Sequence, residues 1–153
     1  MATQVRPKAR QLYDEDFYVW TEAQAELLRK RRFDALDLRN LIEEVEALGR
    51  AEKSSVLNNA SVIIEHLLKL QYSRAQDPRN AWRTSVREPR RRLRRDLTPR
   101  VRQILDTELR ALYVEVRDDT AALLRDYGED APADALPATC PYTLDQITGD
   151  WWP

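Results

Sequence analysis

Three side chains in one stretch of the chain could support acid–base or metal chemistry. They are Glu43, Glu46 and the only histidine, His66. Helical bundles do hold metals with glutamates and histidines from facing helices. On one continuous helix, however, Glu46 and His66 would lie about 30 Å apart, at about 1.5 Å of rise per residue. We therefore favour capping and ion-pairing roles for the acids and a hydrogen-bonded boundary position for His66, and we expect no metal or other cofactor.

An enzymatic alternative uses the same residues. The pair Glu43-x-x-Glu46 resembles the start of the helical nucleotide pyrophosphohydrolase pattern, but no second acidic pair follows at a matching distance. The Glu-x-x-His pair that ferritin-like metal sites need is also absent. A metal-dependent or acid–base hydrolase using Glu43, Glu46 and His66 would therefore need a partner chain or an unexpected fold.

The elements that must position these residues are helices. Apolar residues recur at three- and four-residue spacing between residues 37 and 72, which predicts a long helix with one buried face. They are Leu38, Leu41, Ile42, Val45, Leu48, Val56, Ala60, Ile63, Ile64, Leu67 and Leu68. Gly49 costs such a helix about 1 kcal/mol, yet the stripe resumes in phase beyond it. We predict one long helix, straight or bent at Gly49, rather than a helical hairpin.

Capping residues and prolines divide the rest of the chain. Thr21, with Gln24 three residues later, predicts the start of a short helix, and Asp37 predicts the cap of the long one. A helix over 80–96 contains Pro89, which should kink or end it near residue 88.

Thr98-Pro99 should begin a second long helix that Gly128 ends. Residues 131–141 read as an extended linker, and Thr143 with Gln146 as the capping box of a last short helix.

Composition bounds the class of protein. The chain has 153 residues, three glycines and no alternating apolar pattern, which predicts an all-α fold: a helical bundle built on two long helices with shorter flanking helices. We expect a disordered arm over 1–12 and a single helical domain over 13–153. No apolar segment approaches the roughly 20 residues of a membrane span. One cysteine, Cys140, fits a reducing compartment, so we expect a cytoplasmic protein.

The strongest local charge bias is basic. Nine arginines and only two acids, Glu88 and Asp96, lie between Arg83 and Arg102. Arg91, Arg92 and Arg95 are the candidates for contacts with phosphates of a nucleic acid or another polyanion. Because the formal net charge is only -1, we favour a solvated helix face whose arginines pair with acids elsewhere in the fold.

Several motifs in order resemble the bacterial proteins grouped as domain of unknown function family 29. They are Tyr13-x-x-Asp16-Phe17-Tyr18-x-Trp20, Asn40-Leu41-Ile42-Glu43-Glu44-Val45-Glu46, His66-Leu67-Leu68-Lys69, Trp82-x-x-Ser85-Val86 and Cys140-Pro141-Tyr142-Thr143-Leu144-Asp145. The resemblance covers nearly the whole chain and implies an all-helical fold, but it implies no activity. Asp16, Trp20, Trp82 and Tyr142 within these motifs are our candidate binding residues.

These observations favour a non-catalytic role. The long helices supply large apolar faces that one small chain need not cover by itself. We expect a protein partner, with a homodimer as one form of it. The hydrolase that uses Glu43, Glu46 and His66 is the first alternative, and a nucleic-acid binder that uses 83–102 is the second. The sequence assigns neither the partner nor a substrate.

Overall fold

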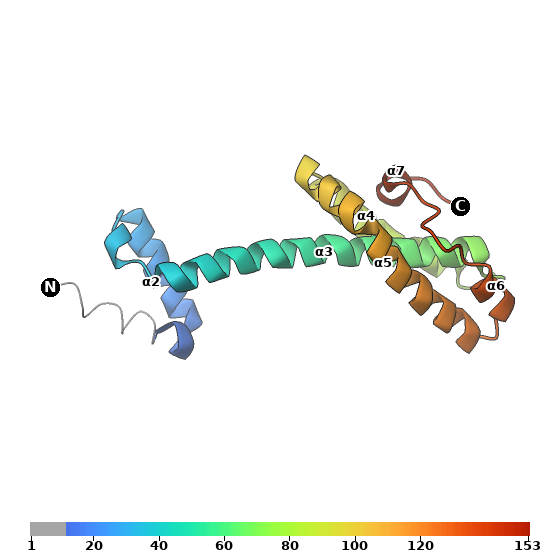
Figure 1. Ribbon diagram of the computed structural model, residues 1–153, viewed down its shortest axis with the longest axis horizontal. Helices are drawn as coiled ribbons and strands as arrows, with labels where there is room; N and C mark the ends of the chain where they lie inside the picture. Colours follow the sequence, from blue (N-terminus) through green and yellow to red (C-terminus); the bar gives the residue numbers. More distant parts are fainter. Residues whose placement is uncertain (1–11) are drawn as a thin grey trace. The chain divides into compact units, whose positions relative to one another are not determined.

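The computed structural model describes residues 12–153, and within that range it contains helices and no strand (Figure 1). Two helices are long: α3 (Leu38–Tyr72) and α5 (Pro99–Asp126). The shorter elements are α2 (Phe17–Arg29), the 3-10 turn η1 (Phe33–Ala35), α4 (Arg79–Asp96), α6 (Asp130–Asp134) and α7 (Leu144–Thr148). The predicted all-α fold built on two long helices is therefore confirmed. The arm expected over 1–12 lies outside the described residues, apart from Leu12.

Contacts along the chain divide it after Ala51 into two compact units. The first unit contains α2, η1 and the beginning of α3. The second contains the rest of α3 and all later helices. None of the described helices is long and apolar enough to cross a membrane.

The helix α2 begins five residues earlier than the sequence suggested, at Phe17 instead of residue 22. Asp16 is its N-cap, and the Asp16 side chain accepts a hydrogen bond of 3.1 Å from the backbone N–H of Val19. The predicted capping box at Thr21 is therefore wrong. Thr21 lies inside the helix and donates to the carbonyl of Tyr18, while Gln24 accepts from the backbone N–H of Asp37. An aspartate cap favours the helix start at residue 17 as well as a threonine would at 22.

The helix α3 is continuous over 35 residues, and Gly49 lies inside it, as predicted. The prediction that its whole apolar stripe is buried is wrong for the first unit. Val56, Ala60 and the apolar residues from 63 to 68 are buried, whereas Leu38, Ile42, Val45 and Leu48 are 55%, 57%, 61% and 71% exposed. The pattern predicts which face of the helix is apolar, but not what covers it.

The sequence predicted that Pro89 kinks or ends the helix near residue 88, and α4 runs through Pro89 without ending, so an end there is wrong. A proline inside a helix costs about 3 kcal/mol, because it removes one backbone hydrogen bond. Packing on both sides offsets this cost. Val86 and Leu93 are fully buried, and Arg90 between them ties the helix to the C-terminal segment.

The helix α5 has the start and end that its sequence predicts. Thr98 caps it, accepting from the backbone N–H of Val101, and Pro99 occupies the first position. Gly128 follows the C-cap with a φ of 75°, a conformation that favours glycine. The N–H of Glu129 then bonds the carbonyl of Leu124, and that of Gly128 bonds Arg125, which together form a Schellman motif.

The segment after α5 differs from the predicted extended linker, because residues 130–134 form the helix α6. Pro132 is tolerated there because the first turn of a helix leaves its N–H groups without intrahelical partners. The capping box of α7 is confirmed in both directions between Thr143 and Gln146.

One hydrophobic core fills the second unit. It combines residues of α3, α4, α5 and α6 with Tyr142, Leu144 and Ile147 of the C-terminal segment. The carboxylate of Glu129 also accepts from the Ser73 hydroxyl at 2.7 Å and from the Arg74 backbone N–H at 2.8 Å, which joins the end of α3 to the end of α5. No described residue of the first unit belongs to this core.

Candidate functional site

Glu43, Glu44 and Glu46 each have separate surroundings in the first unit. Glu43 is exposed to solvent. Glu44 accepts a hydrogen bond of 2.5 Å from the hydroxyl of Tyr13. Glu46 is exposed and lies 3.8 Å from Arg50 one turn later. These roles are the local pairing that charged helix residues commonly have.

His66 belongs to the second unit and is half-buried. Its Nδ1 lies 2.8 Å from the carbonyl oxygen of Val62, one turn earlier on α3. Because a carbonyl only accepts, Nδ1 carries a proton and donates it in this bond. The imidazole is thereby held against its own helix.

No group of three or more His, Cys, Asp or Glu side chains that could hold a metal ion occurs among residues 12–153. An open pocket of about 400 Å³ lies beside α5 and α6. Its two arginines are already paired, Arg117 with Asp118 and Arg125 with Asp134. Burial raises the pKa of the Cys140 thiol, which lowers the reactivity of that cysteine.

Three of the four candidate binding residues of the family motifs, Asp16, Trp20 and Tyr142, make local structural contacts. Trp20 is buried in the first unit, where its indole N–H donates to Asp37 at 3.3 Å. Asp16 caps α2, and Trp82 is half-buried on α4. Tyr142 is buried, and its hydroxyl donates to Gln71 at 2.9 Å. A binding role for these four residues stays a prediction.

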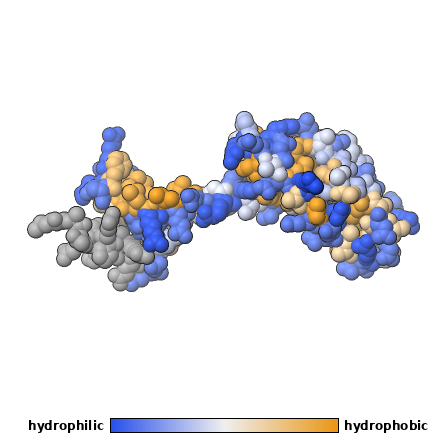
Figure 2. All heavy atoms as spheres, in the orientation of Figure 1, coloured by the Kyte–Doolittle hydropathy of each residue, from blue (hydrophilic) through white to orange (hydrophobic). Residues whose placement is uncertain are grey.

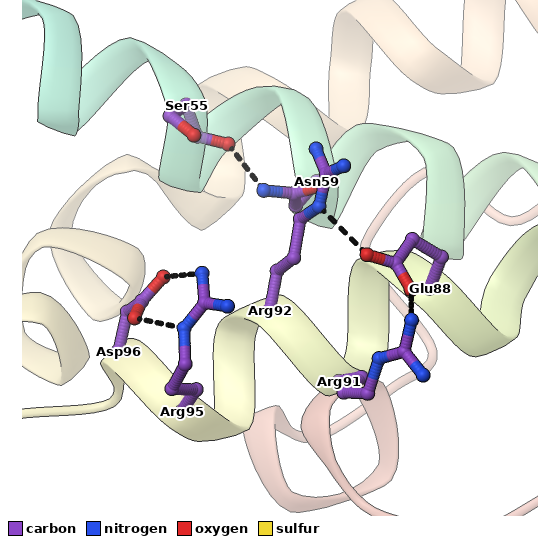
Figure 3. A network of polar contacts seen from close by, with 7 residues as sticks. All are labelled: Ser55, Asn59, Glu88, Arg91, Arg92, Arg95 and Asp96. Atoms are coloured by element: carbon purple, nitrogen blue, oxygen red, sulfur yellow. Dashed lines mark hydrogen bonds and ion pairs between the residues drawn. The ribbon is translucent and has the colours of Figure 1, made fainter.

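Several arginines of α4 have acidic partners, and Figure 3 shows three of them, Arg91, Arg92 and Arg95. Glu88 accepts from Arg91 and, at 3.0 Å, from Arg92, and these bonds hold the pKa of its carboxyl below the usual value. Arg95 bonds Asp96 at 2.9 and 3.2 Å, and this pairing lowers the pKa of Asp96. Two further ion pairs join Arg94 to Asp150 and Arg102 to Asp145. A polyanion would have to compete with these pairs.

Arg90 differs from the other arginines because only 2% of it is exposed. It donates to three backbone carbonyls of the C-terminal segment: Ile147 at 3.0 Å, Gln146 at 2.8 Å and Trp151 at 2.7 Å. Its guanidinium carbon lies 4.6 Å from the ring centre of Trp152, a cation–π contact. Burial lowers the pKa of Arg90. The sequence offered one signal for this role, since Val86, Arg90 and Leu93 are spaced four and three apart on one face.

Exposed apolar surface is the feature of the first unit that structural roles do not explain. Figure 2 shows apolar residues gathered over this part of the chain. Nine of the twelve large hydrophobic residues that are exposed among the described ones belong to it. Four of them, Leu38, Ile42, Val45 and Leu48, follow one another along α3, and we call this surface the open face of α3.

The opposite side of the same helical segment packs within the first unit. Asn40 is buried there and donates to Asp37 at 2.8 Å, while Glu44 bonds Tyr13. Tyr13 in turn contacts Trp20 edge to face, with 4.9 Å between ring centres. The beginning of α3 thus has one side that packs and forms hydrogen bonds within the first unit, and one apolar side that is exposed to solvent.

Fold and candidate site together define an all-helical protein with a well-packed second unit and a first unit that exposes an apolar helix face. The chain belongs to the family described as Domain of unknown function DUF29, whose family model matches residues 12–152. Neither the curated proteins nor the solved structures gave a match.

Proposed function

We propose that this protein is a non-catalytic protein-interaction domain, and that the open face of α3 is where a protein partner binds. The observation that carries the proposal is the exposure of the four large apolar residues of this face. Monomeric proteins rarely expose contiguous apolar patches beyond a few hundred Å², and larger patches mark interaction surfaces.

The energy available from this face suits a protein partner. Each of the four side chains exposes on the order of 100 Å² of apolar surface that a partner could cover. Burying that area contributes about 2.5 kcal/mol of binding free energy, at about 25 cal/mol per Å². The sum of about 10 kcal/mol is comparable with the cost of association, which is about 4–15 kcal/mol. Polar and charged contacts at the rim must supply the remainder. A nucleic acid offers too little apolar surface to gain this energy.

The two alternatives receive less support. A hydrolase would need Glu43, Glu46 and His66 to act together, and each of them has its own local environment instead. A nucleic-acid binder would need free arginines, and five of those between residues 83 and 102 have carboxylate partners. We also propose a bacterial cytoplasmic protein, because the family resemblance and the single cysteine fit that setting.

The test compares two charge insertions of the same kind. Val45→Glu places a charge on the open face, and Val114→Glu places one on an exposed valine of α5 in the second unit. We expect the native host's partner proteins, a second copy of the chain included, to co-purify with the parent and with Val114→Glu but not with Val45→Glu. Equal recovery with both variants would remove the open face from the binding surface.

A further inference from the structure

Resting on the proposed function, we infer that the protein partner of the open face is a second copy of this chain, bound through the same face with the two α3 segments antiparallel. The inference stands on the spacing of the face, its charges, its one glycine and its area.

The spacing on the open face is that of a helix-pairing seam. Three residues of the open face, Leu38, Ile42 and Val45, are separated from one another and from Gly49 by four, three and four residues, so the four positions alternate between d and a of a heptad. Leu48, the fourth apolar residue of the face, lies beside this seam at a g position. In an antiparallel pair, a positions meet d positions of the other helix. The two-fold axis then lies midway between residues 42 and 45. Ile42 meets Val45 of the second copy, and Leu38 meets Gly49 of the second copy.

Gly49 supports this register. It lies inside a helix, where glycine is costly, and a Cβ at its position would meet nothing within 4 Å. The single chain therefore gives no steric reason for a glycine there. A leucine from a second copy, packed against that position, would give one.

The charges beside the seam are self-complementary in the antiparallel arrangement. Arg39 and Glu46 both occupy e positions, and e positions face each other across an antiparallel pair. Arg39 is exposed and has no ionic partner among residues 12–153, and Glu46 makes only its 3.8 Å contact with Arg50. Two-fold symmetry then brings Arg39 of each copy to Glu46 of the other. A parallel pair would offer neither these ion pairs nor the contact of Leu38 with Gly49.

The area of the face matches what a dimer needs. Its four exposed apolar side chains leave on the order of 400 Å² in each copy. Since interfaces are about 60% apolar, this corresponds to about 1,300 Å² in total, within the range of specific complexes. The first unit also needs such support, because among its described residues only Trp20, Gln24 and Asn40 are buried. Small units of this kind commonly depend on oligomerisation, and the partner that is always present during folding is another copy.

Cysteine cross-linking tests the register in the full-length chain. In a Cys140→Ser background, Leu38→Cys and Gly49→Cys are purified separately, and each is oxidised with copper phenanthroline alone and then as a mixture. Antiparallel pairing predicts a disulfide-linked dimer in the mixture only. Identical positions would lie about 16 Å apart along the seam, too far for a disulfide. A dimer from Leu38→Cys alone would indicate a parallel pair and overturn the register.

A charge exchange tests the interface without removing apolar packing. By sedimentation equilibrium, Arg39→Glu should weaken dimerisation about two- to thirty-fold, because it changes two symmetry-related pairs. The double variant Arg39→Glu/Glu46→Arg should restore it, which loss of folding could not do. A parent that remains monomeric at all concentrations would overturn the dimer. The proposed function would then still stand if a protein other than this chain co-purifies with the parent but not with Val45→Glu.

Discussion

Removing the buried guanidinium of Arg90 should destabilise the second unit strongly. Arg90→Ala deletes three hydrogen bonds to carbonyls of residues 146, 147 and 151, of which the one to Ile147 is buried and the other two are partly buried. Hydrogen bonds to charged groups contribute about 1.5–3 kcal/mol each. The guanidinium regains hydration when the protein unfolds, which offsets part of that sum. A carbonyl left without a partner costs about 1–3 kcal/mol when it is buried, so we expect a net loss of about 3–5 kcal/mol for the three.

This magnitude is large enough to measure by thermal unfolding. For a unit of about 100 residues, a loss of about 3–5 kcal/mol lowers Tm by about 15–25 °C. Circular dichroism at 222 nm follows the transition, because α4, α5 and most of α3 lie in the second unit. Arg91→Ala is the matched control. Its side chain is exposed and pairs only with Glu88, so the change should alter stability by less than about 1 kcal/mol.

Two further variants separate charge from packing. Arg90→Met keeps much of the apolar stem against Trp152 but donates no hydrogen bonds, and it should lie between Arg90→Ala and the parent. Arg90→Lys keeps a charge but reaches fewer carbonyls, and it should also be intermediate. If Arg90→Ala and Arg91→Ala melt within a few degrees of each other, the link between α4 and the C-terminal segment contributes little and our account of Pro89 loses its support.

The remaining predictions concern other parts of the chain. Trp20→Ala should cost about 3–5 kcal/mol and raise hydrogen exchange in residues 12–51 before the rest. The bond to Glu44, then burial and nearby acids, raise the pKa of Tyr13 from 10.0 to about 12. The protonated Tyr13 hydroxyl therefore stabilises the first unit fully below about pH 10, and this stabilisation is lost as the pH rises through 12. In an absorbance titration, Tyr13→Phe should lack one late tyrosine ionisation that the parent shows. Gly128→Ala should cost about 1–2 kcal/mol by urea unfolding, and Gly128→Asn less. Nucleic-acid binding should be no tighter than roughly micromolar near physiological salt, and it should be weakened by reversing Arg91, Arg92 and Arg95 without loss of the protein partner.

Local signals in the sequence predicted the helical framework well where capping chemistry specifies it. Thr98-Pro99, Gly128 and the Thr143 capping box each act within a few residues, so a linear pattern contains the information. The start of α2 was predicted wrongly because the local capping signal has two candidates. Both Asp16 and Thr21 are suitable caps, and a linear pattern does not choose between them.

Long-range packing explains what the sequence could not predict. Proline disfavours a helix interior, so the sequence at Pro89 indicates a break, yet α4 continues through it. Arg90, the next residue, donates to a carbonyl 57 residues later in the chain, a contact that no local pattern contains. Among nine arginines, charge alone cannot identify the one that is buried. Its position between two apolar residues of the same face could have done so. A joint role for Glu43, Glu46 and His66 stays a prediction, and the structure places the two glutamates on the part of α3 in the first unit and His66 on the part in the second.

The open face of α3 shows how a wrong burial prediction can indicate function. The same apolar spacing continues along one helix, and the half in the second unit meets a core while the half in the first unit meets solvent. If the stripe were only a folding device, the exposed half would reduce solubility and contribute nothing. Its charges and its glycine instead fit a second helix. Changes at Arg90 should therefore alter the stability of the second unit with the partner surface intact. Changes at Ile42 or Val45 should abolish pairing while that unit melts as before.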